Sequence, residues 1–220
     1  EPQFDLMAER VLVPVYRLLS EESLVALHGS AVVMDGRAWA FVGDSGAGKS
    51  TTTRDLVRQG ARLLADDLTL IDVPNQLALP GAPVVRLIED LDGVDEALDS
   101  RPLFWRQSKH WFRLPDERGC VDPAPLAGVI WLNSHAAEER FEVTELTGQH
   151  AFQRAMAQCF DLSDPEESWR IRRFKLMAQL LRNVAIYEYS YAKSESGEPT
   201  HVESLVEWIT DQSDSRGDNR

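Results

Sequence analysis

Residues 43–50 read GDSGAGKS, and this octapeptide decides the fold of the chain. It matches GxxxxGK[ST], the phosphate loop that joins a buried β-strand to an α-helix. The flanking sequence agrees, because an apolar run at 37–42 precedes the loop and residues 49–58 are typical of a helix that ends before Gly60. We therefore expect a nucleotide-binding domain in which strands and helices are mixed.

The residue types in the loop explain how it would hold phosphate. Glycines let the backbone curl so that its N–H groups point inward and form a concave anion site, to which the following helix adds its dipole. Lys49 would reach the β- and γ-phosphates, and the Ser50 hydroxyl would ligate Mg²⁺. The expected nucleotide-binding residues are Gly43, Asp44, Ser45, Gly46, Ala47, Gly48, Lys49, Ser50 and Thr51.

Two adjacent carboxylates, Asp66 and Asp67, follow the predicted helix inside an apolar segment, 62–72, that we predict to be one strand. Neighbours on a regular strand point to opposite faces, so only one carboxylate could face the phosphates unless the strand bends or ends there. A carboxylate here could hold Mg²⁺ or accept the proton of an attacking hydroxyl. The alternative is a polar strand end with two solvated aspartates.

A phosphate loop indicates a nucleotide and leaves the reaction open. The sequence has no Asn-Lys-x-Asp, which reads guanine in GTPases, and no LSGGQ-like signature of transporter ATPases. It also lacks a run of four apolar residues that ends in Asp-Glu, as many motor ATPases require. These three classes are therefore disfavoured.

Composition narrows the class further. The 220 residues fit one domain, and 43% hydrophobic residues suffice for a core. The net charge of −13 argues against nucleic acid and anionic membranes as main partners. No secretory leader pattern opens the sequence, and the longest apolar stretch, 124–132, is far shorter than a membrane span.

The cysteine usage predicts a location. Cys120 and Cys159 form no CxxC pattern, which indicates two reduced thiols in a cytoplasmic protein. Two cysteines far apart in the sequence, with five scattered histidines, do not indicate a zinc site.

The rest of the chain reads as a mixture of elements, which predicts one α/β or α+β domain with a mixed sheet over residues 1–210. We expect residues 99–119 to be irregular and 211–220 to be a disordered tail. The predicted strands are 24–34, 37–42, 62–72, 126–132, 141–146 and 184–191. Residues 5–19, interrupted at Pro14, predict a short helix followed by a turn or strand, and the other predicted helices are 49–58, 86–98, 148–160, 165–182 and 201–210.

A basic segment at 101–113, RPLFWRQSKHWFR, stands out in this acidic chain. It suits a local anion site, either a loop that closes over the triphosphate or the source of a charge-stabilising arginine. Lys109 and Arg113 are our candidates for nucleotide contact. The alternative, which we weigh equally, is a solvated loop whose tryptophan rings pack against the protein.

Three tyrosines, Tyr187, Tyr189 and Tyr191, alternate along the last predicted strand. Alternation places them on one face of the sheet. Tyrosine is common on strands, so we interpret the three as sheet packing.

Three stretches together carry a family resemblance. His28-Gly29, the residues FVGDSGAGKS at 41–50 and the residues RLLADD at 62–67 resemble the catalytic domain of HPr kinase/phosphorylase. The resemblance is specific over about residues 26–72. It implies a phosphate-loop kinase fold related to phosphoenolpyruvate carboxykinase, and transfer of phosphate from ATP, with Mg²⁺, to a serine hydroxyl.

The resemblance also implies roles for single residues. Asp67 matches the aspartate that acts as general base toward the acceptor hydroxyl, and Asp66 matches its neighbour, which supports the base and the metal. His28 matches a histidine beside the site. The implied catalytic residues are therefore Asp67, Asp66, His28 and Lys49, and the implied metal ligands are Ser50 and Asp66.

The sequence departs from the family in two places that bear on the substrate. The loop continues as Lys49-Ser50-Thr51, where the family has Lys-Ser-Glu, and the later arginine–glycine signature linked to the carrier protein and to phosphorolysis is not found. The layout, without the large N-terminal domain, is more similar to stand-alone HPr-kinase-like proteins encoded beside peptide-modification genes.

We therefore expect an ATP- and Mg²⁺-dependent kinase whose acceptor is a hydroxyl on a peptide or protein. Three alternatives stay open: an ATP-binding regulator or assembly protein that transfers nothing, a plain ATPase, and a kinase of a small-molecule hydroxyl. An assembly of several identical copies is compatible with each of them.

Overall fold

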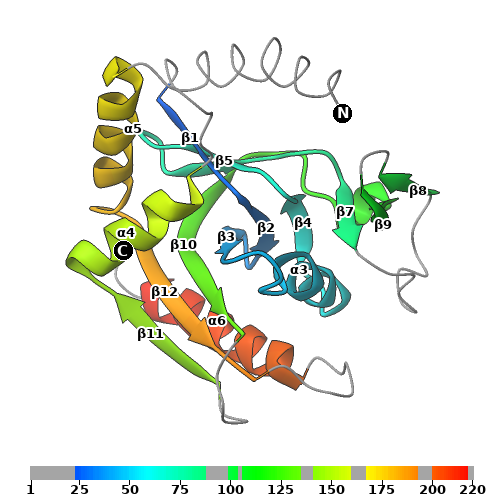
Figure 1. Ribbon diagram of the computed structural model, residues 1–220. Helices are drawn as coiled ribbons and strands as arrows, with labels where there is room; N and C mark the ends of the chain where they lie inside the picture. Colours follow the sequence, from blue (N-terminus) through cyan, green and yellow to red (C-terminus); the bar gives the residue numbers. More distant parts are fainter. Residues whose placement is uncertain are drawn as a thin grey trace.

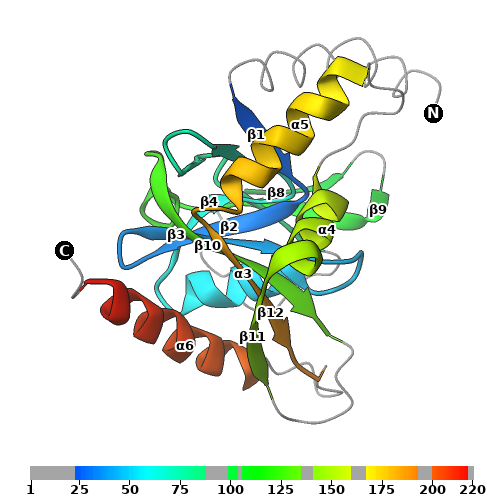
Figure 2. The same ribbon diagram turned by 90° about the vertical axis from the view of Figure 1, so that its left-hand side faces the viewer.

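The computed structural model describes residues 23–87, 99–103, 106–134, 141–159, 167–192 and 200–217. Figures 1 and 2 show a twisted sheet with helices on both faces, so the predicted mixed α/β class is confirmed. The short helix and following turn or strand predicted for 5–19 lie outside the described residues, as does most of the helix predicted at 86–98, whose first two residues belong to a strand. Within the described ranges, no helix is long and apolar enough to cross a membrane.

The central sheet has nine strands among the described residues, and β10 (Ala124–Asn133) is the central strand, which pairs with three others. β10 pairs in parallel with two strands, one on each side, and its first residues pair antiparallel with a third strand. The order across the sheet is β1 (Leu24–Leu27), β5 (Thr69–Asp72), β6 (Leu77–Leu79), β10, β3 (Arg37–Val42), β2 (Gly29–Met34) and β4 (Arg62–Ala65). On the other side, β10 pairs with β12 (Ala185–Ser190), which pairs with β11 (Glu142–Leu146).

Both faces of this sheet are covered, which explains the unbroken apolar runs of β3 and β10. On one face lie α4 (Gly148–Gln158) and α5 (Glu167–Leu180), and on the other α3 (Lys49–Arg58) and α6 (Thr200–Gly217). Side chains alternate between the two cores: Ala40 and Val42 of β3 pack toward α4 and α5, while Trp39 and Phe41 pack toward α3 and α6. A strand covered on both faces needs apolar residues at every position.

A second, three-stranded sheet corrects the prediction for residues 99–119. The strands β7 (Val84–Leu87), β9 (Arg106–Arg113) and β8 (Asp99–Leu103) pair in that order, and a short 3-10 helix spans Asp116–Arg118. The segment is therefore mostly extended, not irregular. β9 forms backbone hydrogen bonds with β8 inside the segment and with β7 outside it, and no regular alternation of apolar and polar residues in RPLFWRQSKHWFR marks these strands.

Two predicted strands are each broken in the middle, which is the correction that matters most for the site. The segment 24–34 divides at His28 into β1 and β2, and the segment 62–72 divides at residues 66–68 into β4 and β5. Apart from α6, the other predicted strands and helices that lie among the described residues match the observed elements within a few residues, and β6 was not predicted. At the other end of the chain, α6 continues to Gly217, so the disordered tail expected from residue 211 is wrong as far as residue 217.

Candidate active site

The phosphate loop, residues 43–50, joins β3 to α3 as predicted. Gly46 and Gly48 have φ angles of 81° and 90°, in the left-handed region that residues with a Cβ rarely adopt. The turn is closed by the Ala47 amide, which donates to the Asp44 carbonyl at 3.0 Å. The first bond of α3 runs from the Thr52 amide to the Gly48 carbonyl at 2.8 Å. The loop thus curls directly onto the N-terminus of a helix, which favours an anion.

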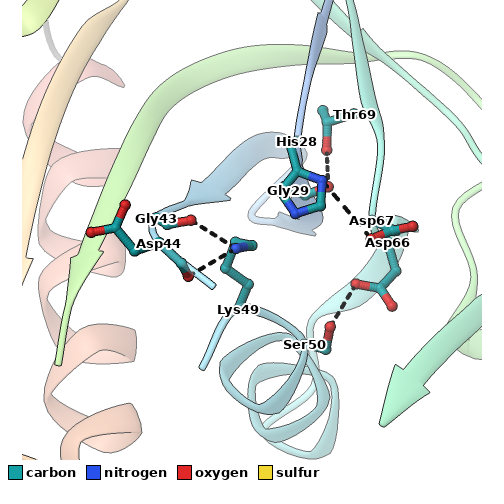
Figure 3. A network of polar contacts seen from close by, with 9 residues as sticks. All are labelled: His28, Gly29, Gly43, Asp44, Lys49, Ser50, Asp66, Asp67 and Thr69. Carbon is teal, nitrogen blue, oxygen red and sulfur yellow. Dashed lines mark hydrogen bonds and ion pairs between the residues drawn. The ribbon is translucent and has the colours of Figure 1, made fainter. Parts of the chain in front are cut away.

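Lys49 holds its charge at the mouth of this loop. Its ammonium donates to the Gly43 carbonyl at 2.7 Å and to the Asp44 carbonyl at 3.2 Å. Figure 3 shows the ammonium between these carbonyls and the His28 ring. Asp44, Ser45, Gly46 and Thr51 are exposed around it, whereas Gly43 and Ala47 are buried beneath. A cation at this position can pair with phosphate oxygens bound to the loop amides.

Ser50 and Asp66 form the second feature of the site. The Ser50 hydroxyl donates to Asp66 Oδ1 at 3.1 Å, and Asp66 is only 8% exposed. A hydroxyl and a carboxylate side by side supply the hard oxygen ligands that Mg²⁺ prefers, with room for phosphate oxygens and waters to complete the shell. The residues present therefore fit the metal that the sequence predicted.

Asp67 and His28 form the third feature. His28 Nδ1 lies 4.0 Å from Asp67 Oδ1, and the two side chains are 48% and 51% exposed. β4 ends at Ala65, and Asp67 has a φ angle of 72°, a conformation in which the strand cannot continue. The carboxylates of Asp66 and Asp67 consequently both reach the side of the sheet on which the loop lies (Figure 3).

The strand breaks explain why His28 and Asp67 meet. β2 pairs with β4, and β1 pairs with β5, where Leu27 opposes Thr69. The break at His28 and the break at residues 66–68 therefore lie opposite each other. The Thr69 hydroxyl donates to the Gly29 carbonyl at 3.1 Å, and the His28 amide donates to the Gln158 carbonyl at 2.7 Å, so both breaks are held in place.

The basic segment is placed in the three-stranded sheet, which meets α3 through β7 (Figure 1). Phe112 and Leu114 are buried in the same core as α3, whereas the Arg113 side chain is exposed. The segment is a strand and not the solvated loop of the alternative, and the two tryptophan side chains named there, Trp105 and Trp111, lie outside the described residues. The Lys109 side chain lies outside the described residues, and nucleotide contact by Lys109 and Arg113 stays a prediction.

The sequence analysis did not identify Tyr191 as a residue that contacts the phosphate loop. The Tyr191 hydroxyl donates to the Ala47 carbonyl at 2.7 Å, although its alternation with Tyr187 and Tyr189 indicated sheet packing alone. Tyr191 is the residue immediately after β12, and no motif marks it. Its position at the carboxyl end of a strand parallel to β10 was the one signal that could have pointed toward the loop.

Comparison with known proteins supports the predicted resemblance. No family model matches the chain. It is 44% identical over 64 residues to HPr kinase/phosphorylase of Treponema pallidum, a match that covers 29% of this chain and 20% of that protein. With HPr kinase/phosphorylase of Shouchella clausii it shares 45% identity over 60 residues, 27% of this chain and 19% of that protein.

These matches span about a fifth of the relatives' own length. Over that stretch the chain is similar to HPr kinase/phosphorylases, as the three quoted motifs predicted. Among solved structures, the Hpr(Ser) kinase/phosphatase from Coxiella burnetii aligns with 88% of this chain and 94% of its own, with a TM-score of 0.40 and 12% identity.

Proposed function

We propose that the protein is an ATP-dependent kinase that transfers the γ-phosphoryl group to the hydroxyl of a serine on a peptide or protein. The observation that carries the proposal is the gathering of three features at one loop: Lys49, the Ser50–Asp66 pair and the His28–Asp67 pair. The similarity to proteins named HPr kinase/phosphorylase supports the same reaction class.

In this proposal the phosphate loop binds ATP. Its amides surround the β-phosphate, and Lys49 moves from the loop carbonyls to the β- and γ-phosphates. The Ser50 hydroxyl and the Asp66 carboxylate hold Mg²⁺. When bound, the metal supplies positive charge that stabilises the phosphate oxygens in the transition state.

Asp67 acts as the base. The acceptor hydroxyl loses its proton to Asp67 while its oxygen forms a bond to the γ-phosphorus, and the bond to the bridging oxygen of ADP breaks in line. The carboxylate has acceptor capacity for this proton, and the His28 ring, 4.0 Å away, orients it. The products are a phosphorylated acceptor and ADP.

The exposure of Asp67 supports a large acceptor. With about half of its side chain open to solvent, the carboxylate can be reached by a hydroxyl on a peptide or protein without closure of the site. We place this reaction in the cytoplasm, in keeping with two buried cysteines that form no disulfide.

Transfer of label from γ-³²P-ATP tests the proposal. Wild type, Asp67→Asn and Asp35→Asn are incubated with Mg²⁺, a lysate of the source cells and serine-containing peptides encoded beside the gene. Asp35 is a matched control, because it is exposed in the β2–β3 turn and has a φ angle of 49°, close to the 72° of Asp67.

We expect a labelled acceptor with wild type and Asp35→Asn, and a loss of labelling by about 10²–10⁴-fold with Asp67→Asn. Equal labelling by Asp67→Asn would contradict the role of Asp67. ADP release without an acceptor would favour an ATPase. Tight ATP binding with neither label nor ADP would favour a regulator.

A further inference from the structure

Behind the phosphate loop lies a buried tyrosine whose hydroxyl is bonded to the backbone of the loop. Tyr191 is 4% exposed, and its hydroxyl donates to the Ala47 carbonyl at 2.7 Å. The Thr52 side chain on α3 interacts with the same hydroxyl. Tyr191 therefore connects the carboxyl end of β12 to the loop and to the first turn of its helix.

The geometry of the peptide bond gives this contact a consequence. A trans peptide group is planar, and its C=O and N–H bonds point in opposite directions. The described chain contains no cis peptide bond. Since the Ala47 carbonyl points toward the Tyr191 hydroxyl in the core, the N–H of the same peptide group, which belongs to Gly48, points away from Tyr191. Amides aimed in this way bind phosphate oxygens.

We propose that Tyr191 is a positioning residue for nucleotide binding, whose hydroxyl fixes the direction of the Gly48 amide. The inference rests on the proposed function of the loop. It assigns to Tyr191 a share of nucleotide affinity without any contact between the tyrosine and the nucleotide.

The tyrosine is itself held rigidly. Its ring stacks on His201 of α6, with 4.1 Å between centroids and 12° between planes, and on Tyr189 at 5.4 Å and 29°. The Tyr191 amide donates to the Asn133 carbonyl at 3.0 Å, and the Tyr189 hydroxyl donates to the His201 carbonyl at 2.6 Å. A ring fixed on two sides and at its backbone keeps its hydroxyl at one point.

Three further observations agree with this positioning role. A Cβ on Gly48 would lie 2.7 Å from the Tyr191 hydroxyl, so the glycine allows this close approach as well as a φ angle of 90°. Burial raises the pKa of Tyr191, which keeps the hydroxyl protonated and able to donate. Burial lowers the pKa of His201, so the stacked ring is neutral near pH 7.

Binding of Mg·ADP, measured by calorimetry, tests the inference. Tyr191→Phe removes the hydroxyl and keeps the ring stack, while Tyr189→Phe makes the same change two residues away on a hydroxyl that does not reach the loop. We expect Tyr191→Phe to weaken binding about three- to tenfold, as loss of a buried hydrogen bond does, and Tyr189→Phe to leave it unchanged.

A purely structural role predicts a different result. Both variants would then lower the melting temperature of the nucleotide-free protein to a similar extent, with no difference in affinity for Mg·ADP. His201→Leu is the second variant, because it removes the stacked ring and keeps the Tyr191 hydroxyl; we expect it to weaken binding in the same direction. It keeps the test decisive if Tyr191→Phe is recovered unfolded.

The outcomes separate this inference from the proposed function. If wild type binds Mg·ADP and the folded Tyr191 and His201 variants bind it equally well, the positioning role is overturned and the nucleotide site stands. If wild type binds no nucleotide, the site is overturned and the positioning role with it.

Discussion

At the scale of single residues, the backbone at Asp67 arranges the two carboxylates. Its φ angle of 72° lies in the left-handed region, which aspartate adopts more readily than most residues because its short side chain bonds locally. On a continuing strand, Asp66 and Asp67 would face opposite ways. The change of conformation lets Asp66 bond to Ser50 while Asp67 stays beside His28.

Replacing Ser50 tests whether its hydroxyl is a ligand of the metal. Ser50→Ala removes the hydroxyl that bonds to Asp66 and, in our account, ligates the metal. We expect the gain in ATP affinity on adding Mg²⁺ to fall by about tenfold, the value of one lost polar contact to a charged group. Titrations with and without EDTA measure this gain, and affinity in EDTA should stay as in wild type. A full Mg²⁺ effect in Ser50→Ala would argue against Ser50 as a ligand.

At the scale of elements, β10 is the central strand of the sheet, and Gly128 is the position on it that neighbouring side chains approach most closely. A Cβ on Gly128 would lie 2.8 Å from Trp39 Cζ3 on β3 and 3.1 Å from Tyr187 Cε2 on β12. Trp39 and Tyr187 belong to the two strands that pair in parallel with β10. The glycine therefore makes room for two large rings over a central strand.

Gly128→Ala should destabilise the protein through overpacking, by about 1–3 kcal/mol in the free energy of unfolding. Urea unfolding measures the change. Trp39→Phe removes the ring atom nearest to the added methyl group, so the double variant should be more stable than the sum of the two single changes. If the changes in the free energy of unfolding of the two single variants simply added, the Trp39 ring would not be the group that the added methyl group crowds.

Some of these elements could be predicted from the sequence, and others could not. The phosphate loop, β3 and α3 followed from a motif and its apolar neighbour, since both signals are local. The breaks at His28 and Asp67 did not follow, because each apolar segment looks like one long strand and only the pairing of β1 with β5 and β2 with β4 separates its halves. The fold of 99–119 was missed for another reason, because β8 and β9 pair within the segment without a regular alternation of apolar and polar residues, and β7 joins β9 from outside it.

At the scale of the whole molecule, the site is assembled from both ends of the described chain. Tyr191 reaches Ala47 across 144 positions of sequence, and His201 on α6 stacks behind it. No local pattern predicts such a contact, whereas the motif residues Lys49, Ser50, Asp66, Asp67 and His28 could be proposed from sequence. Only the folded chain shows that the last strand and helix support the first loop.

Through His201, the stability of the protein depends on pH. Burial lowers its pKa below the ordinary value of about 6.5, an effect that Asp55 partly opposes. The unfolded chain then binds the proton more readily, so the free energy of unfolding decreases as the pH falls below about 6.5. The slope should stay below the one-proton limit of about 1.4 kcal/mol per pH unit, since the ring is partly exposed.

Urea unfolding between pH 5 and pH 7 measures this dependence. His201→Phe keeps a flat ring in the stack and should reduce the slope below pH 6.5, whereas His150→Gln, a change at an exposed position on α4, should leave the slope as in wild type. An unchanged slope in His201→Phe would assign the dependence to other groups.

Every step of the account needs the phosphates of ATP at residues 43–50, so the decisive measurement is equilibrium binding of ATP with Mg²⁺ to wild type, Lys49→Ala and Lys175→Ala. Lys175 is exposed on α5 and serves as the matched control. We predict one ATP per chain for wild type and Lys175→Ala, and affinity lower by about tenfold or more for Lys49→Ala, which loses a charged partner of the phosphates. Absence of binding by wild type, or equal affinity in Lys49→Ala, would contradict the account.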